Sequence, residues 1–273
     1  MRSVCRLNDL YDGINLDKRQ TTNSLESQKM IPILGHMRAL SCTLLILLCL
    51  VESPNAQEKA VLFHEDFATL DNWKPFYFPK IKRHTVYTIQ KDGERHYLKA
   101  ESNASASAIV YKDSFNVYDF PRVRWRWKVN SVYVKGDART KAGDDYPMRV
   151  YVMFEYDPDT AGTFEKVKYG LAKKMYGEYP PHSSLSYVWS SKEGPESILV
   201  SPYTDKAMMV LLQRGAKNVG TWQEQEINIV DDYQKAFGAK PPRRARIAIM
   251  NDSDNTGERS ISFMEYIEVF RLP

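Results

Sequence analysis

Cysteine is scarce and is confined to one end of the chain. The 273 residues contain three cysteines, Cys5, Cys42 and Cys49, and all of them precede Ala56. A domain built from the rest of the chain therefore has no disulfide, even in an oxidising compartment. A domain of that length buries enough apolar surface to fold without a covalent staple.

Several motifs of common chemistries are also missing. The chain has no Gly-x-Ser-x-Gly elbow, no His-Glu-x-x-His pair and no glycine-rich phosphate loop. These absences disfavour a serine esterase of the usual hydrolase type, a zinc enzyme and a nucleotide site. Glu265 and Glu268 lie three apart on an expected strand, so they should point to opposite faces, which is wrong for a glycosidase pair. The net charge of +4 is modest and does not favour a nucleic-acid partner.

One apolar run stands out near the start of the chain. Met37 and Arg38 precede the uncharged run 39–51, and small residues end at Ala56. This pattern predicts a cleaved signal peptide at 37–56 and a periplasmic mature protein. The run is too short to favour a transmembrane helix, and a non-cleaved anchor is the alternative. Residues 1–36 are polar and aperiodic, which suggests an upstream start assigned in error; the alternative is a disordered cytoplasmic leader.

From residue 60 onward, short alternating segments recur at near-regular spacing. The expected strands are 60–67, 76–78, 85–89, 96–100, 108–111, 122–129, 148–154, 185–189, 197–201, 207–213, 222–229, 246–250 and 261–270. Helical spacing over 163–175 predicts one helix over the sheet or beside its edge, and 231–237 predicts a second. The pattern predicts a mainly β domain over 57–273, an antiparallel β-sandwich or jelly roll with one or two short peripheral helices.

The segment 122–129 has the strictest alternation. Val123, Trp125, Trp127 and Val129 share one face, and Arg122, Arg124, Arg126 and Lys128 share the other. The tryptophan face is expected to pack in the core, although flat aromatic rings also suit stacking on sugars. The cationic face would attract an anionic ligand such as an acidic glycan, unless neighbouring strands supply acids that pair with it.

A polar loop precedes the strand that begins near Met148. It carries Asp137, Asp144 and Asp145, and Arg149 follows Asp145 by four positions on the same side. An Asp145–Arg149 ion pair is one interpretation. The other is a carboxylate that binds a ligand or takes part in acid–base chemistry, because close carboxylates raise one another's pKa.

A second polar loop alternates oxygen-bearing side chains with a glycine. It runs Asp252-Ser253-Asp254-Asn255-Thr256-Gly257-Glu258. Asp252, Asp254 and Thr256 are candidate calcium ligands, although Phe263 stands where a calcium loop needs its bidentate glutamate. A turn held by Asp and Asn side chains is the alternative. We expect Asp144, Asp145 and Arg149 to meet Asp252, Asp254 and Asn255 at one end of the sandwich.

Blocks of residues across the domain resemble a bacterial family of exported proteins known as the domain of unknown function DUF3047. The blocks are Trp125-Arg126-Trp127, Gly143-Asp144-Asp145, 149–154, Tyr187-Val188-Trp189, Trp222, Asp232-Tyr233, Phe237-Gly238, 247–250 and 252–256. The resemblance covers nearly all of 60–270. It implies a periplasmic, β-rich protein, and it implies no activity and no catalytic residue.

Three hypotheses follow for the function. The first is a ligand-binding module for a carbohydrate or cell-envelope polymer, with Arg124 and Arg126 as further candidate contacts. The second is a hydrolase of envelope glycans that uses Asp144 and Asp145 with Asp252 and Asp254. The third is a structural or assembly protein in which the acidic turns only hold the sandwich together. The sequence leaves open whether the protein is an enzyme, and it predicts no membrane span in the mature chain.

Overall fold

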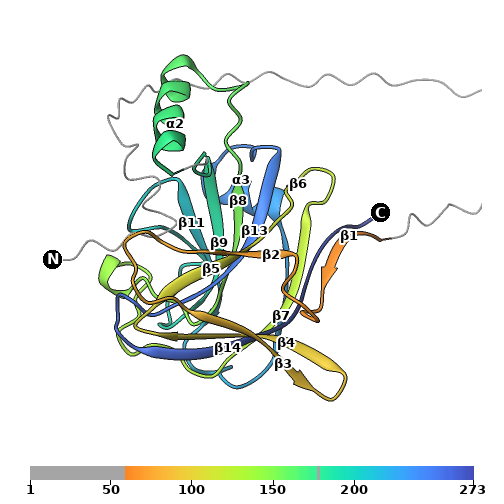
Figure 1. Ribbon diagram of the computed structural model, residues 1–273, viewed down its shortest axis with the longest axis vertical. Coiled ribbons are helices and arrows are strands. Elements are labelled where there is room, and N and C mark those ends of the chain that lie inside the picture. The colour runs from red at the N-terminus through yellow and green to blue at the C-terminus, as the bar shows by residue number, and fades with distance from the viewer. Residues whose placement is uncertain (1–58, 177–178) are drawn as a thin grey trace, which may run out of the picture. The chain divides into compact units, whose positions relative to one another are not determined.

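The computed structural model describes residues 59–176 and 179–273 (Figure 1). The upstream segment 1–36 and the expected signal peptide 37–56 lie outside the described residues. The described chain forms two β-sheets of six and eight strands. It is a mainly β sandwich with two short α-helices, which confirms the fold class that the alternation predicts.

The six-stranded sheet, here called sheet A, is antiparallel throughout. Its strands run in the order β12-β7-β14-β4-β3, and β1 pairs with the far end of the long strand β14. The strands are β1 (Ala60–Glu65), β3 (Val86–Asp92), β4 (Arg95–Asn103), β7 (Arg122–Val129), β12 (Gln223–Asn228) and β14 (Arg259–Arg271). The β3–β4 turn contains Gly93 at φ 62°, a conformation that glycine adopts readily, and Asp92-Gly93 is a sequence typical of a tight hairpin turn.

The eight-stranded sheet, sheet B, runs in the order β10-β11-β9-β8-β13-β5-β2, with β6 paired to β13. Its strands are β2 (Trp73–Phe76), β5 (Ala106–Tyr111), β6 (Phe115–Asn116), β8 (Arg149–Phe154), β9 (Ser183–Ser190), β10 (Ile198–Val200), β11 (Ala207–Arg214) and β13 (Arg244–Asp252). Strands β9 and β11 pair in parallel, and the other pairs are antiparallel. Every residue of β8 is buried, because β8 lies between β9 and β13 and is covered on both faces.

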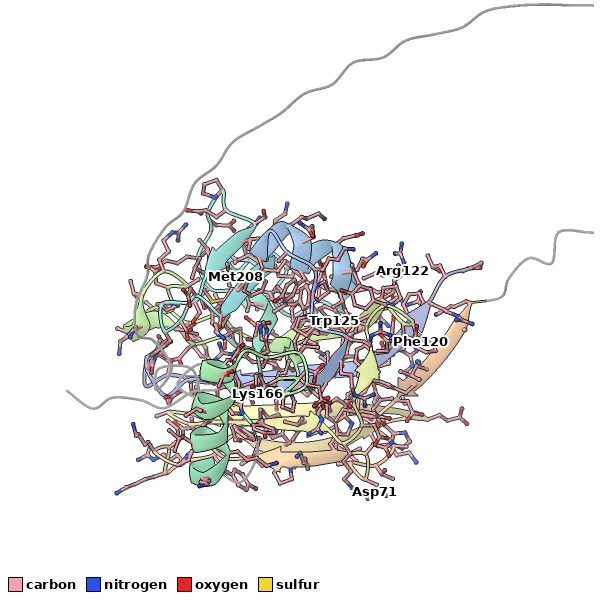
Figure 2. All side chains as sticks on the ribbon, turned by 90° about the horizontal axis from the view of Figure 1, so that it is seen from above. Asp71, Phe120, Arg122, Trp125, Lys166 and Met208 are labelled. Atoms are coloured by element: carbon pink, nitrogen blue, oxygen red, sulfur yellow. The ribbon has the colours of Figure 1, made fainter. Side chains whose placement is uncertain are left out.

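The core lies between the two sheets. Trp125 and Trp127 of β7 are fully buried, and their rings lie 5.7 Å from Tyr187 and 5.9 Å from Trp189 of β9. Figure 2 shows Trp125 among the packed side chains of the interior. The tryptophan face of 122–129 is therefore core, as the alternation predicts, and it is not a sugar-stacking surface.

The structure of strand β14 differs from the prediction that Glu265 and Glu268 point to opposite faces. Its pairing with β7 shifts between Met264 and Tyr266, which is a β-bulge. The extra residue reverses the alternation, so Glu265 and Glu268 both reach cations on the outer face of sheet A, Arg126 and Arg124. The expectation that the two glutamates point to opposite faces is wrong for this reason.

Two α-helices accompany the sheets, as predicted. The first, α2, spans Thr163–Tyr176, and the second, α3, spans Ile229–Phe237. The side chain of Asn228 caps the start of α3, and Gly238 ends it in the left-handed conformation at φ 68°. Among the described residues, no helix is long and apolar enough to cross a membrane.

Candidate functional site

The loop before β8 is shaped by a glycine. A 3₁₀ turn, η1 (Lys141–Gly143), begins at Thr140, whose side chain accepts a hydrogen bond from the Gly143 N–H. The Gly143 carbonyl accepts from Asp137 N at 2.7 Å and from Asp145 N at 2.8 Å. A Cβ on Gly143 would lie 2.5 Å from Asp137 N, so only glycine fits there. The tight turn sends Asp144 and Asp145 into the protein interior.

These residues join a cluster that we call the acidic junction, made of Asp144, Asp145, Arg149, Asp252 and Asp254. Arg149 is buried, and its guanidinium forms an ion pair with the Asp252 carboxylate and lies 3.9 Å from Asp144. The guanidinium also lies against the Tyr146 ring, at 4.8 Å from its centroid. Such a pair is costly to break, because either partner left alone is a charge held out of water.

Asp145 has a different role in the acidic junction. Its carboxylate accepts hydrogen bonds from the backbone N–H groups of Thr256, at 2.6 Å, and Asn255, at 3.4 Å. The two polar loops are therefore tied together, and Asp252 N donates back to the Tyr146 carbonyl at 3.2 Å. The structure thus brings the two loops side by side, while their role as a ligand site stays a prediction.

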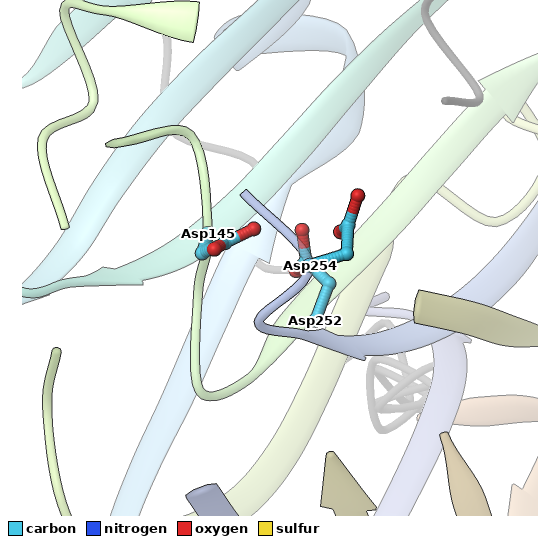
Figure 3. A group of neighbouring side chains, drawn as sticks. All are labelled: Asp145, Asp252 and Asp254. Atoms are coloured by element: carbon cyan, nitrogen blue, oxygen red, sulfur yellow. The ribbon is translucent and has the colours of Figure 1, made fainter. Parts of the chain in front are cut away.

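Three carboxylates of the acidic junction are spaced as cation ligands would be. Asp145, Asp252 and Asp254 each offer an oxygen, and these oxygens lie within 4.8 Å of one another (Figure 3). Calcium holds its oxygens at about 2.3–2.6 Å, so two ligands of one ion lie up to about 5 Å apart. These three residues could hold a hard cation. Thr256, the third ligand that the sequence suggested, contributes its backbone N–H to Asp145 instead.

A buried tyrosine, Tyr146, packs against the acidic junction. Burial raises the pKa of Tyr146 well above its usual value, and the charge of Asp144 raises it further. Its hydroxyl donates to the Met209 sulfur at 2.9 Å. Tyr146 therefore serves as packing against Arg149 and not as a proton carrier at neutral pH.

The rim of the acidic junction is more accessible. The Asn255 side-chain amide donates to Tyr203 Oη at 3.1 Å and to the Lys141 carbonyl. Asp137 lies outside the acidic junction, where a hydrogen bond from Lys192 lowers its carboxyl pKa. Asp137 therefore supplies no group to the cluster of Figure 3.

The two arginines that the sequence offered to an anionic ligand are paired with acids. Arg124 donates to Glu268 at 2.8 and 2.6 Å, and Arg126 bonds Glu265. Burial opposes ionisation of Glu268, but hydrogen bonds from Lys59, Arg124 and His64 hold its pKa below the usual value. The alternative that neighbouring strands neutralise this cationic face therefore holds at Arg124 and Arg126.

Lys128 differs from its two neighbours on β7. Its ammonium lies 4.9 Å from the Trp222 ring and 4.9 Å from the Phe263 ring, and among the described residues it forms no ion pair. The Tyr97 ring lies 5.3 Å from that of Trp222, and the Arg126 guanidinium lies 5.5 Å from it. We call this group, Tyr97, Arg126, Lys128, Trp222 and Phe263, the aromatic–cationic face. All five residues are partly exposed.

Sequence reasoning found only part of the aromatic–cationic face. It placed the cations on the outer side of 122–129, but it named Trp222 only among the residue blocks that carry the family resemblance. Tyr97 and Phe263 come from β4 and β14, and only the strand order β7-β14-β4 brings them beside Lys128. Alternation within each strand could have placed each ring outward, but it could not have placed the rings together.

Solved structures similar to this chain are sandwich proteins at very low identity. The winged bean acidic lectin complexed with methyl-α-D-galactose is 8% identical with a TM-score of 0.33, covering 77% of this chain and 98% of the lectin. The Bauhinia forficata lectin in complex with GalNAc is 8% identical with a TM-score of 0.36, covering 79% and 99%. Endoglucanase 3 of Trichoderma harzianum, from family GH12, is 7% identical with a TM-score of 0.35, covering 78% and 96%. Similarity at this level does not extend to a ligand or an activity.

The sequence itself matches one family model and no curated protein. No match is found among curated proteins. The family model described as "Protein of unknown function (DUF3047)" matches residues 71–268, which contain both the acidic junction and the aromatic–cationic face. The chain therefore belongs to the DUF3047 family, as the resemblance of its sequence blocks indicated.

Proposed function

We propose that this protein is an exported, periplasmic module that binds an acidic carbohydrate or cell-envelope polymer through the aromatic–cationic face. The observation that carries the proposal is the pairing of Lys128 with Trp222. A lysine without an ion pair among the described residues lies 4.9 Å from the ring of a partly exposed tryptophan.

The chemistry of this face suits a sugar polymer that carries carboxylates. An aromatic ring offers a flat apolar surface to the C–H face of a sugar, and tryptophan is enriched among the residues that carry most of the binding energy of an interface. Lys128 can pair with a uronic carboxylate without breaking an ion pair among the described residues, whereas Arg124 would have to leave Glu268. The face lies on the outer side of a sheet, which gives an extended polymer room to lie along it.

The acidic junction supports a structural role and not catalysis. Asp144, Asp145 and Asp252 are 0%, 1% and 0% exposed, so in this conformation they cannot touch a polymer. Asp254, the fourth carboxylate of the hydrolase hypothesis, is partly exposed but has no accessible second carboxylate among these four to act with it. A general acid or base has to come within hydrogen-bond reach of its substrate. The hydrolase hypothesis that used these carboxylates is therefore less well supported than binding.

Affinity for a polyuronate tests the proposal. Isothermal titration compares polygalacturonate with the uncharged polymer dextran. We expect binding to polygalacturonate that weakens with salt, because exposed charges are screened. Trp222→Ala should weaken it about 30-fold, which corresponds to a hot-spot loss of about 2 kcal/mol. Lys128→Ala should weaken it less and should reduce the salt dependence.

A matched control is Tyr77→Ala, which removes an aromatic residue that is 55% exposed and lies outside the aromatic–cationic face. Its affinity should equal that of the wild type. Equal affinities of the wild type and Trp222→Ala for polygalacturonate would show that this face is not the binding surface. Release of reducing sugars during the titration would instead support the hypothesis that the protein is a hydrolase.

A further inference from the structure

Helix α2 is attached to the domain along one side. Tyr169 is fully buried, and its ring stacks on Tyr156 at 3.8 Å with an angle of 6° between the planes. Its hydroxyl donates to the Pro181 carbonyl at 3.4 Å and accepts from the Lys206 ammonium at 3.3 Å. Figure 1 shows α2 beyond the ends of β9 and β11.

The opposite side of α2 carries exposed apolar side chains. Val167 and Leu171 are 60% and 59% exposed. Each is two positions from Tyr169, so at about 100° per residue each points roughly 160° away from the docked side. A Cβ on Gly170 would meet no atom within 4 Å, which shows that this flank of the helix is open. The apolar side of α2 thus faces away from the sheets.

The charge on α2 is mostly positive. The helix contains Lys166, Lys168, Lys173 and Lys174 and a single acid, Glu165. Glu165 lies on the docked side, where it is 4.0 Å from Lys206. Lys166, labelled on α2 in Figure 2, and Lys174 are exposed. The part of the helix that solvent reaches is therefore apolar and basic.

We propose that α2 docks this protein on an anionic lipid surface. A basic amphipathic helix lies in the headgroup region with its apolar side inserted and its lysines paired with lipid phosphates. Lysines near an anionic bilayer are attracted by its negative surface potential. A second copy of the chain is a poorer occupant, because two basic helices repel each other. Two exposed apolar side chains are also far short of a standard protein interface.

Sedimentation with vesicles tests this proposal. The full chain is mixed with vesicles of phosphatidylcholine alone or with phosphatidylglycerol added. We expect binding only to the anionic vesicles, and we expect added salt to weaken it. The double variant Val167→Ser/Leu171→Ser leaves the charge unchanged and should weaken vesicle binding about tenfold, because it removes the exposed apolar side chains that would insert. The matched control Val86→Ser/Ile89→Ser changes two exposed apolar residues on β3, 59% and 36% exposed, and should bind like the wild type.

Three results would overturn the proposal: equal binding of the double variant and the wild type, equal binding to neutral and anionic vesicles, or no binding to either. A dimer in analytical ultracentrifugation that dissociates in the double variant, without lipid binding, would assign the helix to a second copy. Near-UV circular dichroism should show that the double variant is folded. Polygalacturonate affinity should be unchanged in it, which separates this proposal from the one above.

Discussion

Removing the guanidinium of the acidic junction should destabilise the protein strongly. In Arg149→Met, the Asp252 carboxylate loses its ion-pair partner and Asp144 loses the nearby positive charge. Methionine keeps most of the length of the side chain and its packing against Tyr146, so the main change is the loss of charge. The variant therefore isolates the electrostatic part of the acidic junction.

The expected magnitude follows from burial. The side chains of Arg149 and Asp252 are 1% and 0% exposed, so water cannot replace the lost partner. Breaking a buried pair by removing one partner costs about 3–5 kcal/mol. For a domain of this size, 1 kcal/mol corresponds to about 2–4 °C in the melting temperature, so the expected fall is about 6–20 °C.

Guanidinium unfolding followed by tryptophan fluorescence measures the change. The control is Arg244→Met, also in sheet B, which removes an arginine that is 56% exposed and pairs with Glu155 at 3.3 Å. Exposed pairs contribute about 0–1 kcal/mol, so the control should stay close to the wild type. If Arg149→Met lost no more stability than Arg244→Met, the buried Arg149–Asp252 ion pair would not contribute to stability as expected.

Three further predictions concern the acidic junction and a half-buried histidine. Gly143→Ala should cost about 1–3 kcal/mol in chemical denaturation, because its Cβ would lie 2.5 Å from Asp137 N. Gly162→Ala meets no atom within 4 Å and should cost less, because only the preference for glycine at the start of α2 is lost. Calcium held by the three carboxylates of Figure 3 should raise the melting temperature by about 8–16 °C at a thousand times its dissociation constant. Asp254→Asn should abolish this shift. No shift in the wild type would mean that these carboxylates have a structural role only. Burial and the charge of Lys206 lower the pKa of His182, so the unfolded chain binds the proton more readily. Stability should therefore fall as the pH drops below 6.5, and His182→Gln should remove that part of the pH dependence; identical pH profiles of the two proteins would refute it.

The strands were predictable where one face is apolar and the other is charged. The segment 122–129 forms β7 over those same residues, because tryptophan and valine on one side and cations on the other admit one register. Alternation could not show the bulge in β14, because a single inserted residue leaves no mark in the residue types on either side of it. The outward position of Glu265 therefore required the structure.

The candidate site was predictable as a meeting of two loops but not in its pairings. Asp144 and Asp145 end the loop before β8, and Asp252 ends β13, which is antiparallel to β8. Proximity along the chain favoured Asp145 as the partner of Arg149. The pairing of Arg149 with Met250 across the sheet brings Asp252 to the guanidinium. Strand register, which the sequence does not encode locally, decides that contact.

The side of helix α2 that is buried was also not predictable from the sequence alone. Its periodicity predicted a helix over 163–175, and the structure has one at Thr163–Tyr176. The apolar positions 167 and 171 of that periodicity are exposed, because Tyr169 on the opposite side makes the buried contact. Periodicity identifies an apolar side, while the stack of Tyr169 on Tyr156 decides which side is docked.

Acrylamide quenching of tryptophan fluorescence tests the proposed binding face most directly. The chain has five tryptophans. Trp73, Trp125, Trp127 and Trp189 are at most 5% exposed, so Trp222 dominates the quenchable signal. Polygalacturonate bound on the aromatic–cationic face should shield Trp222 and lower the quenching constant towards that of Trp222→Phe. An unchanged quenching constant at saturating polygalacturonate, with dextran as the reference, would contradict the proposed function.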